Sequence, residues 1–309
     1  MRIVVSEFMD EAAVDTLRAR FEVMHDAGLV DDRARLLTSL ASADALIVRN
    51  RTQVDAALLA AAPRLRAVGR LGVGLDNIDT AACEARSVAV FPATGANAVA
   101  VAEYVICTAM MLLRGFWNAT PAVAAGGWPR AALSSGREVS GRTLGLVGFG
   151  GIGQMVAERA LGLGMRVVAT DPALAPELPL WGERGVKPLP LEQVLAAADV
   201  VSLHVPLTTQ TRNLIDAGRI ATMKPQAVLI NTSRGGIVDE TALAAALRAG
   251  SLAGAALDVF DEEPLQKGAS VADAPNLLLT PHIAGLTFES NQRISSMVAD
   301  RVARFLSAG

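Results

Sequence analysis

Three polar segments in the last third of the chain contain the side chains best suited to chemistry. Arg234 lies in NTSRGG (231–236), Glu263 in DVFDEEP (258–264) and His282 in TPHIAG (280–285). An arginine can bind a carboxylate and polarise a carbonyl. A histidine can exchange a proton with a hydroxyl group, and a nearby glutamate raises its pKa and fixes its tautomer. These residue types suit hydride transfer between a nicotinamide and an alcohol or ketone.

The same residues also permit ordinary structural interpretations. His282 is one of three histidines and could be a core residue, and a Glu-Pro pair usually belongs to a loop. Each segment, however, follows a predicted strand, and ligands of parallel sheets bind beyond the carboxyl ends of the strands. This placement favours the catalytic interpretation.

A second pattern predicts a dinucleotide site. Thr143–Val147 is a short apolar strand, and Gly148-Phe149-Gly150-Gly151-Ile152-Gly153 follows as G-x-G-x-x-G before a predicted helix. The glycines allow a tight turn, approach of a pyrophosphate and close packing of the helix, whose N-terminal amides face the phosphates. Asp171, after a second strand at 166–170, can accept both ribose hydroxyls and repel a 2′-phosphate. The pattern predicts NAD rather than NADP.

Two arginines follow strands of the first hundred residues. Arg49 follows a strand at 45–48, and Arg70 follows one at 67–69 and leads into Gly72-Val73-Gly74. Two arginines at equivalent strand ends favour an anion pocket over solvated surface charges, and the glycine turn can offer backbone N–H groups.

These residues need two α/β units to position them. Strands and helices alternate through the first part, which indicates a parallel sheet covered by helices on both faces. A long helix at 98–114 leads into a second unit, for which we expect six strands. The final helix at 288–306 has apolar residues at helical spacing and is expected to return to the first unit. The predicted domains are 1–97 with 286–309, and 98–285.

The composition excludes several classes. The net charge is −3, which does not favour nucleic-acid binding. The longest apolar run, 98–113, is interrupted by Glu103 and is too short for a membrane span. No export signal precedes the first strand, and Cys83 and Cys107 lack metal spacing. We therefore expect a cytoplasmic protein with no bound metal.

The chain resembles the D-isomer-specific 2-hydroxyacid dehydrogenase family, especially its 3-phosphoglycerate dehydrogenase branch. The resemblance covers nearly the whole chain and depends on VGRLGVGLDNID, TLGLVGFGGIG, NTSRGGIVDE, AGAALDVFDEEP and TPHIAG, in that order. It implies a Rossmann NAD-binding domain inserted into a flavodoxin-like substrate domain. It also implies a homodimer formed through the irregular segment 115–141.

The resemblance assigns roles residue by residue. Arg234 resembles the arginine that binds the substrate carboxylate, Glu263 the partner of the histidine, and His282 the acid/base. Asp258 resembles the residue that holds the nicotinamide carboxamide. Further cofactor contacts are implied for the glycine turn and for Gly151, Ile152, Asp171, Val205 and Thr232, and substrate contacts for Arg49, Arg70, Gly72, Val73, Gly74 and Asn97.

Two departures from the family pattern matter. Gly151 stands where many relatives have an arginine that faces the pyrophosphate, so one charge contact with the cofactor is missing. The sequence ends at Gly309, so we expect no regulatory domain of the kind found in longer phosphoglycerate dehydrogenases, and no feedback by serine.

The expected substrate is a 2-hydroxy acid with a second anionic group, such as 3-phosphoglycerate or sulfolactate, because two unpaired arginines in a closed cleft would be costly. A hydroxypyruvate or glyoxylate reductase is the alternative within the family. A formate dehydrogenase is disfavoured, since those relatives have glutamine where this chain has Glu263. From another class, an NADH-sensing corepressor would be expected to carry disordered tails.

Overall fold

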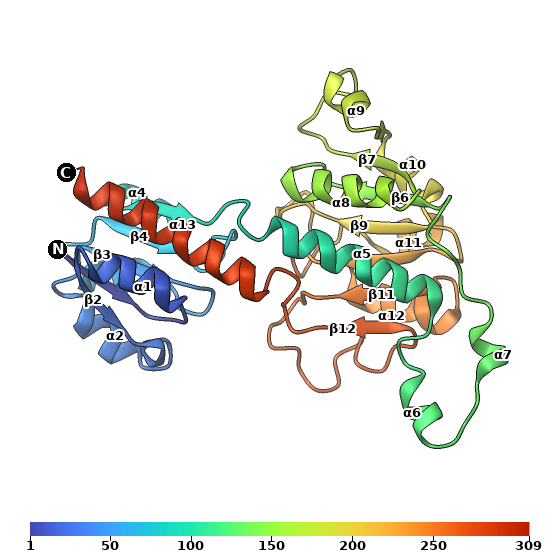
Figure 1. Cartoon of the computed structure of the whole chain (residues 1–309), viewed down its shortest axis with the longest axis horizontal. Helices are drawn as coiled ribbons and strands as arrows, with labels where there is room; N and C mark the ends of the chain where they lie inside the picture. Colours follow the sequence, from blue (N-terminus) through green and yellow to red (C-terminus); the bar gives the residue numbers. More distant parts are fainter. Residues whose placement is uncertain (309) are drawn as a thin grey trace. The chain divides into compact units, whose positions relative to one another are not determined.

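The chain folds into two compact units, each an α/β domain with a parallel sheet. The computed structural model describes residues 1–308 (Figure 1). The first unit contains Met1–Asn97 and the segment from Leu286 onward, and the second contains Ala98–Gly285. The second unit is therefore inserted between two parts of the first. The predicted fold class, two parallel-sheet α/β domains, is confirmed.

The first unit has a five-stranded parallel sheet in the order β2-β1-β3-β4-β5, the strand order of flavodoxin-like folds. Its strands are β1 (Arg2–Val5), β2 (Glu22–His25), β3 (Ala45–Val48), β4 (Ala67–Arg70) and β5 (Ala89–Pro92). Its helices are α1 (Glu11–Arg18), the 3-10 helix η1 (Ala27–Asp31), α2 (Arg33–Leu40), α3 (Ala56–Ala61), α4 (Thr80–Ala85) and α13 (Phe288–Ser307).

The helix α13 packs on the first unit, against α1, β4 and β5. Its apolar side chains Ile294, Val298 and Val302 recur every fourth residue and are buried with Ile3 and Ile47 in one core. Burial of this stripe joins the C-terminal segment to the first ninety-seven residues, because apolar area removed from water stabilises the packed helix.

The second unit has a seven-stranded parallel sheet in the order β12-β11-β10-β9-β6-β7-β8. Its strands are β6 (Thr143–Val147), β7 (Arg166–Thr170), β8 (Lys187–Pro188), β9 (Val200–Leu203), β10 (Val228–Asn231), β11 (Gly254–Leu257) and β12 (Leu277–Leu279). Its helices are α5 (Ala98–Arg114), α6 (Thr120–Ala124), α7 (Arg130–Leu133), α8 (Gly151–Gly162), α9 (Pro179–Glu183), α10 (Leu191–Ala197), α11 (Ala217–Thr222) and α12 (Glu240–Ala249).

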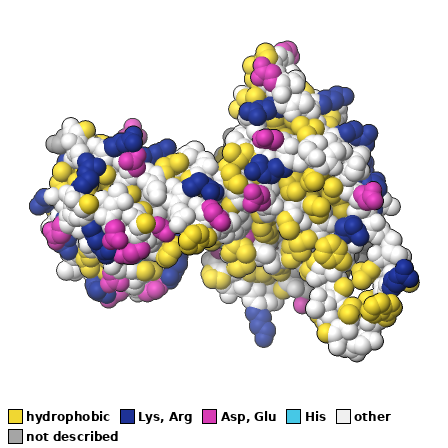
Figure 2. All heavy atoms as spheres, viewed as in Figure 1, with side chains coloured by type: hydrophobic (Ala, Val, Ile, Leu, Met, Phe, Trp, Pro, Cys, Tyr) yellow, Lys and Arg dark blue, Asp and Glu magenta, His cyan; other side chains and the backbone are white. Residues whose placement is uncertain are grey.

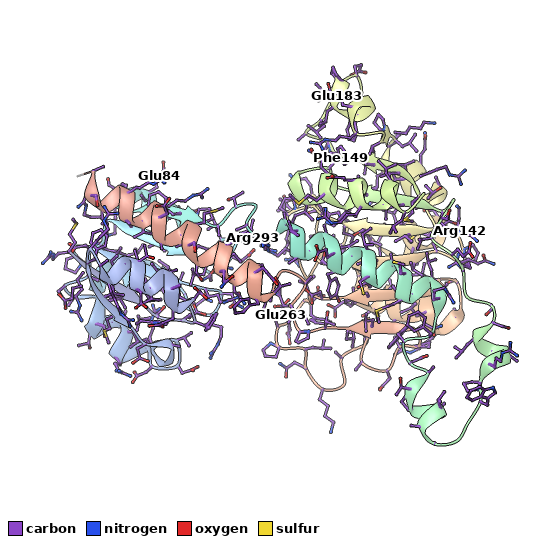
Figure 3. The ribbon with its side chains drawn as sticks, in the orientation of Figure 1. Glu84, Arg142, Phe149, Glu183, Glu263 and Arg293 are labelled. Atoms are coloured by element: carbon purple, nitrogen blue, oxygen red, sulfur yellow. The ribbon has the colours of Figure 1, made fainter. Side chains whose placement is uncertain are left out.

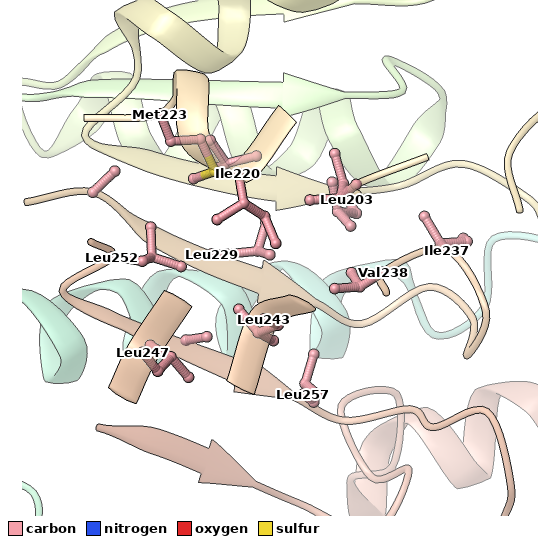
Figure 4. Close-up of a cluster of buried hydrophobic side chains, with 14 of the residues drawn as sticks. Leu203, Ile220, Met223, Leu229, Ile237, Val238, Leu243, Leu247, Leu252 and Leu257 are labelled. Carbon is pink, nitrogen blue, oxygen red and sulfur yellow. The ribbon is translucent and has the colours of Figure 1, made fainter. Parts of the chain in front are cut away.

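Apolar cores lie on both faces of this sheet. On one face, α5 and α8 cover buried residues such as Leu146 and Ile230. On the other face, Leu203 and Leu229 pack with Ile220 of α11 and Leu243 of α12 (Figure 4). Because each central strand is buried on both sides, its sequence is continuously apolar rather than alternating.

Two details differ from the sequence expectation. The second sheet has seven strands rather than six, because Lys187–Pro188 adds the edge strand β8, which is too short to produce a recognisable pattern. The alternation of strands and helices in the first part of the sequence predicts a helix at 31–40. In the structure this helix begins two residues later, at Arg33, where the Asp32 carboxylate accepts the N–H of Arg35 and caps it.

The segment between α5 and β6 projects as an arm that contains the short helices α6 and α7, neither of which has a buried residue. Trp128 is 79% exposed on it, and Phe116 and Val123 are also exposed. Hydrophobic side chains are visible on this arm in Figure 2. Among residues 1–308, no helix is both long enough and apolar enough to cross a bilayer.

Replacing Val298 with alanine tests how α13 stabilises the first unit. Val298 is fully buried against this core, so the change should lower the free energy of unfolding by about 1–3 kcal/mol. The exposed neighbour Ser296, replaced with alanine, should change it by less than about 0.5 kcal/mol. Urea unfolding followed by circular dichroism measures both values, and equal effects would contradict this packing.

Candidate active site

The glycine turn lies between β6 and α8, at the point where the strand order of the second sheet reverses. Gly148 has φ of 98°, and a Cβ added there would lie 2.5 Å from the carbonyl oxygen of His204. A Cβ added to Gly153 would lie 2.5 Å from the carbonyl oxygen of Gly148. Cβ atoms at Gly150 and Gly151 would meet nothing within 4 Å. The turn thus has two glycines required by its packing and two facing open space, as a pyrophosphate site needs.

Asp171 follows β7 beside this turn. One of its carboxylate oxygens accepts the N–H of Phe149 at 2.8 Å, and the other accepts the N–H of Ala173 at 3.0 Å. The Phe149 ring is buried and stacks on Trp181 with ring centres 4.7 Å apart. Figure 3 labels Phe149 beside α8. These contacts hold the turn and leave further acceptor positions on the Asp171 carboxylate for a ribose.

Thr232 and Val205 follow the neighbouring strands β10 and β9. The Thr232 hydroxyl oxygen is buried and has no hydrogen-bond partner within residues 1–308. A buried polar atom without a partner is costly, and a bound ligand would satisfy it. Together with the open glycines, this hydroxyl fits the NAD that the sequence predicts.

Glu263 and His282 form the central contact of the candidate site. A carboxylate oxygen of Glu263 lies 2.7 Å from Nδ1 of His282, and its other oxygen accepts the N–H of Phe260 at 3.1 Å. The Glu263 and His282 side chains are 35% and 45% exposed, respectively. A carboxylate accepts hydrogen bonds, so Nδ1 carries the hydrogen, and Nε2 remains for exchange of a proton with a ligand. Figure 3 labels Glu263.

The Arg234 segment packs against the segment that contains Glu263. The Asn231 side-chain amide donates to the carbonyl of Arg234 at 2.9 Å. A Cβ added to Gly235 would lie 1.8 Å from the carbonyl oxygen of Phe260, so only glycine fits at this close approach. The ends of β10 and β11 therefore lie side by side, and Arg234 shares this edge of the sheet with Glu263.

Asp258 holds the loop that contains His282. Its buried carboxylate accepts the N–H of Ile283 and of Ala284, both at 2.8 Å, and the hydroxyl of Thr280 at 2.6 Å. His282 itself has φ of 55°, a left-handed conformation that is unfavourable for residues other than glycine. Hydrogen bonds on both sides of His282 offset this cost. One acceptor position on Asp258 remains for a nicotinamide amide.

The three histidines have different environments. His25 lies on β2 in the first unit, 3.5 Å from Glu11. His204 bonds to the Ser202 hydroxyl at 3.0 Å, and burial lowers its pKa to about 4, so it is neutral at pH 7. Only His282 combines an exposed ring with a carboxylate partner among the strand-end loops of the second unit. His282 is therefore not a core residue, and His204 is half-buried and neutral.

In the first unit, Arg49 lies where the strand order reverses, between the ends of β1 and β3. Its backbone N–H donates to Glu7 at 2.8 Å, and its guanidinium donates to the Asn291 side chain at 2.7 Å and lies 5.6 Å from the Phe8 ring centre. Burial lowers the pKa of Arg49, although the charge of Glu7 opposes that shift. A partly buried guanidinium with donors left over is suited to an anionic ligand.

The Glu7 carboxylate organises the loop that follows β3. Besides Arg49 it accepts the N–H of Arg51 at 3.1 Å and of Thr52 at 3.0 Å, and it is only 4% exposed. We did not predict Glu7 from the sequence, although Ser6 and Glu7 follow β1 at a strand end, as Arg49 follows β3. Ligands of parallel sheets bind beyond the carboxyl ends of the strands, so a search for polar residues after β1 would have identified Glu7.

Arg70 is the last residue of β4 rather than the first residue after it. A Cβ added to Gly72 would lie 2.1 Å from Nη1 of Arg70, so the guanidinium lies directly over this turn. The N–H of Gly72 donates to the carbonyl of Arg70 at 2.8 Å, which leaves the amides of Val73 and Gly74 for an anion. The side-chain oxygen of Asn97 is buried without a hydrogen-bond partner in the described chain.

Comparison with known proteins identifies the family. Residues 106–284 match the model of the D-isomer specific 2-hydroxyacid dehydrogenase NAD-binding domain. The chain is 57% identical over 306 residues to (S)-sulfolactate dehydrogenase of Chromohalobacter salexigens, covering 98% of both chains. It is 38% identical to D-3-phosphoglycerate dehydrogenase of Mycobacterium leprae, covering 97% of this chain and 56% of that protein. A solved structure from Thermus thermophilus has a TM-score of 0.90 at 36% identity, over 100% of this chain and 97% of that one.

The chain therefore belongs to the D-isomer-specific 2-hydroxyacid dehydrogenase family. It is an NAD-dependent oxidoreductase of 2-hydroxy acids, and the second unit contains its NAD-binding domain. It spans 56% of the length of the phosphoglycerate dehydrogenase from M. leprae and nearly all of the sulfolactate dehydrogenase.

Alanine substitutions at glycines of α8 test the cofactor turn. Gly153→Ala should weaken NADH binding by about tenfold or more, since the new Cβ must displace the helix from the turn. Gly162→Ala, at the other end of α8 and with open space around its Cβ, should leave the Kd for NADH within about twofold. Fluorescence titration measures both, and wild-type affinity in Gly153→Ala would contradict the packing described.

The neutral state of His204 predicts a pH dependence of stability. Its pKa is about 4 in the folded protein, against 6.5 for a histidine in the unfolded chain, so the unfolded chain binds an extra proton between these values. The free energy of unfolding should fall as the pH is lowered through this window, by roughly 2 kcal/mol at pH 5 from this group. His204→Asn should remove this component in urea titrations at pH 7.5 and pH 5. An unchanged pH dependence would contradict the burial of a neutral ring.

Proposed function

We propose that this chain interconverts a 2-hydroxy acid that has a second anionic group and the corresponding 2-keto acid, with (S)-sulfolactate as the substrate. The 2.7 Å contact between Glu263 and His282 supports the chemistry most directly, because it leaves Nε2 of His282 to exchange a proton with the substrate hydroxyl. The 57% identity to a sulfolactate dehydrogenase favours sulfonate over phosphate as the second anion.

Three residues of the second unit, His282, Glu263 and Arg234, carry the proposed chemistry. Bound NADH supplies the hydride that reaches C2 of the keto acid. The protonated imidazole of His282 gives the keto oxygen its proton in that direction, and Glu263 stabilises the imidazolium and fixes its orientation. Arg234 binds the C1 carboxylate and polarises the carbonyl. In oxidation His282 accepts the proton instead.

We assign substrate binding to the first unit and NAD binding to the second. Arg49 and Arg70, with the amides of Val73 and Gly74 and the side chain of Asn97, would bind the second anion. Asp171 and Thr232 would contact the ribose moieties of NAD, and Asp258 the carboxamide. Gly148, Gly150, Gly151, Ile152, Gly153 and Val205 complete the proposed cofactor site.

We further propose a cytoplasmic homodimer that has no nucleic-acid or membrane partner. The exposed Trp128, Phe116 and Val123 on the arm between α5 and β6 support a subunit contact there. Both cysteines are free thiols, which is consistent with a reducing compartment.

Oxidation of NADH by a panel of 2-keto acids tests the substrate class. Sulfopyruvate and 3-phosphohydroxypyruvate carry a second anion, whereas hydroxypyruvate, glyoxylate and pyruvate do not. We expect kcat/KM to be higher for the first two acids than for the other three, because charge-assisted hydrogen bonds to the second anion strengthen binding. The identity to a sulfolactate dehydrogenase favours sulfopyruvate as the better of the two. Preference for glyoxylate or hydroxypyruvate would favour the reductase alternative. Turnover of no keto acid, with NADH still bound, would favour a sensor protein.

Arg49 provides a sharper test of the second-anion site. Arg49→Gln should lower kcat/KM for sulfopyruvate by roughly 10–100-fold, the loss expected for one or two hydrogen bonds to a charged group. The value for pyruvate should change by less than about threefold. Arg51→Gln is the matched control, since this exposed arginine on the same loop is paired with Asp31. Equal losses of kcat/KM for sulfopyruvate and pyruvate would show that Arg49 does not bind the second anion.

A further inference from the structure

Tyr104 is the only tyrosine of the chain, and it lies on α5. It has no place in the proposed chemistry, and no sequence pattern distinguishes it. Its hydroxyl oxygen lies 2.5 Å from Oγ1 of Thr280, two residues before His282. This polar contact joins the long helix α5 to the loop that contains the proposed acid/base, His282.

The direction of this hydrogen bond follows from the neighbouring one. The Thr280 hydroxyl has a single hydrogen, and it is donated to the Asp258 carboxylate, which can only accept, at 2.6 Å. Thr280 must therefore accept from Tyr104. Burial raises the pKa of the Tyr104 phenol, so the phenol keeps the proton that it donates. The result is an ordered chain of donors from Tyr104 through Thr280 to Asp258.

This chain ends at the group that holds the loop on the other side of His282. Asp258 accepts the N–H groups of Ile283 and Ala284, and the N–H of His282 donates to the Thr280 carbonyl at 3.0 Å. His282 is held in a left-handed conformation between these attachments. Hydrogen bonds in series strengthen one another, so the phenol makes Thr280 a better donor to Asp258.

We propose that Tyr104 is a positioning residue for His282, acting through Thr280 and Asp258 on residues 280–284. This inference rests on the proposed acid/base role of His282. Tyr104 has a contact with the loop and none with Glu263 or His282 among the hydrogen bonds of the described chain. Loss of the Tyr104 hydroxyl leaves the Asp258 carboxylate and its acceptor position for the nicotinamide carboxamide in place, so the effect is expected in kcat rather than in the Kd for NADH.

Tyr104→Phe isolates the hydroxyl because the ring that packs on the core is retained. We expect kcat with sulfopyruvate, or with the best keto acid of the panel, to fall by about threefold to tenfold, the range for one lost hydrogen bond. KM for the keto acid and Kd for NADH should stay within about twofold. Thr280→Val should cause an equal or larger fall, and the double variant should match Thr280→Val alone, since both changes interrupt one chain.

Thr143→Val is the control, because this buried threonine lies at the other end of β6, away from the strand-end loops. It should leave kcat within about twofold of wild type. In a His282→Ala background, adding Tyr104→Phe should not reduce the residual turnover further. Hydrogen–deuterium exchange of the peptide covering 280–284 should be faster in Tyr104→Phe than in wild type or Thr143→Val.

Several outcomes would overturn the proposal. One is a kcat of Tyr104→Phe equal to that of Thr143→Val. Another is a rise in the Kd for NADH that matches the fall in kcat. A third is an exchange rate of residues 280–284 in Tyr104→Phe equal to that of wild type. If His282→Ala retained wild-type turnover, the acid/base assignment itself would fail. The exchange rate would then decide whether Tyr104 positions this loop, independently of activity.

Discussion

The hydrogen bond between Glu263 and His282 is the interaction on which the rest of this structure depends. The acid/base role proposed for His282 requires that the imidazole keep one orientation, and neither residue lies in a helix or strand that would fix it. The second unit supplies that rigidity through backbone bonds. Phe260 donates to Glu263, and Asp258 accepts from the two residues after His282. These hydrogen bonds offset the energetic cost of the left-handed backbone conformation of His282. The edge of the sheet therefore stabilises the geometry of the site.

Both units position functional side chains by the same rule. In each parallel sheet the strand order reverses once, and the loops on either side of that point diverge and leave room for a ligand. The second unit has its glycine turn there, between β6 and β9, and the first unit has Glu7 and Arg49, between β1 and β3. The two sheets differ in their strand order, but the reversal of that order provides the cofactor site in one and the candidate anion site in the other.

Much of this architecture could be predicted from the sequence, because its main signals are local. Doubly buried strands such as Val228–Asn231 are continuously apolar, and the G-x-G-x-x-G turn marks the start of α8. The position of Arg234, Glu263 and His282 after three predicted strands placed them at one edge of the sheet, and in the structure Glu263 and His282 are in contact there. Where the signal was weak, the prediction was wrong in detail: β8 has only two residues and was not predicted, and α2 begins at Arg33 rather than at Asp31.

The contacts that the sequence did not predict are those between distant segments. Tyr104 and Thr280 are separated by 176 positions, and Arg49 and Asn291 by 242, so neither pair leaves a local pattern. Glu7 was missed for a different reason: its position after β1 makes it a candidate, but the sequence does not show what a single carboxylate at a strand end contacts. The structure supplies that information, because Glu7 accepts hydrogen bonds from three backbone N–H groups.

The most direct test of the central claim is the rate of a single turnover. NADH bound to the His282→Asn variant would be mixed with saturating keto acid, and the loss of NADH absorbance followed by stopped flow. The account predicts a rate lower by about 100-fold or more, the usual contribution of a general acid, with the Kd for NADH unchanged. A rate equal to that of wild type would show that His282 does not supply the proton, and the assignment of this pair as the catalytic acid/base would be wrong.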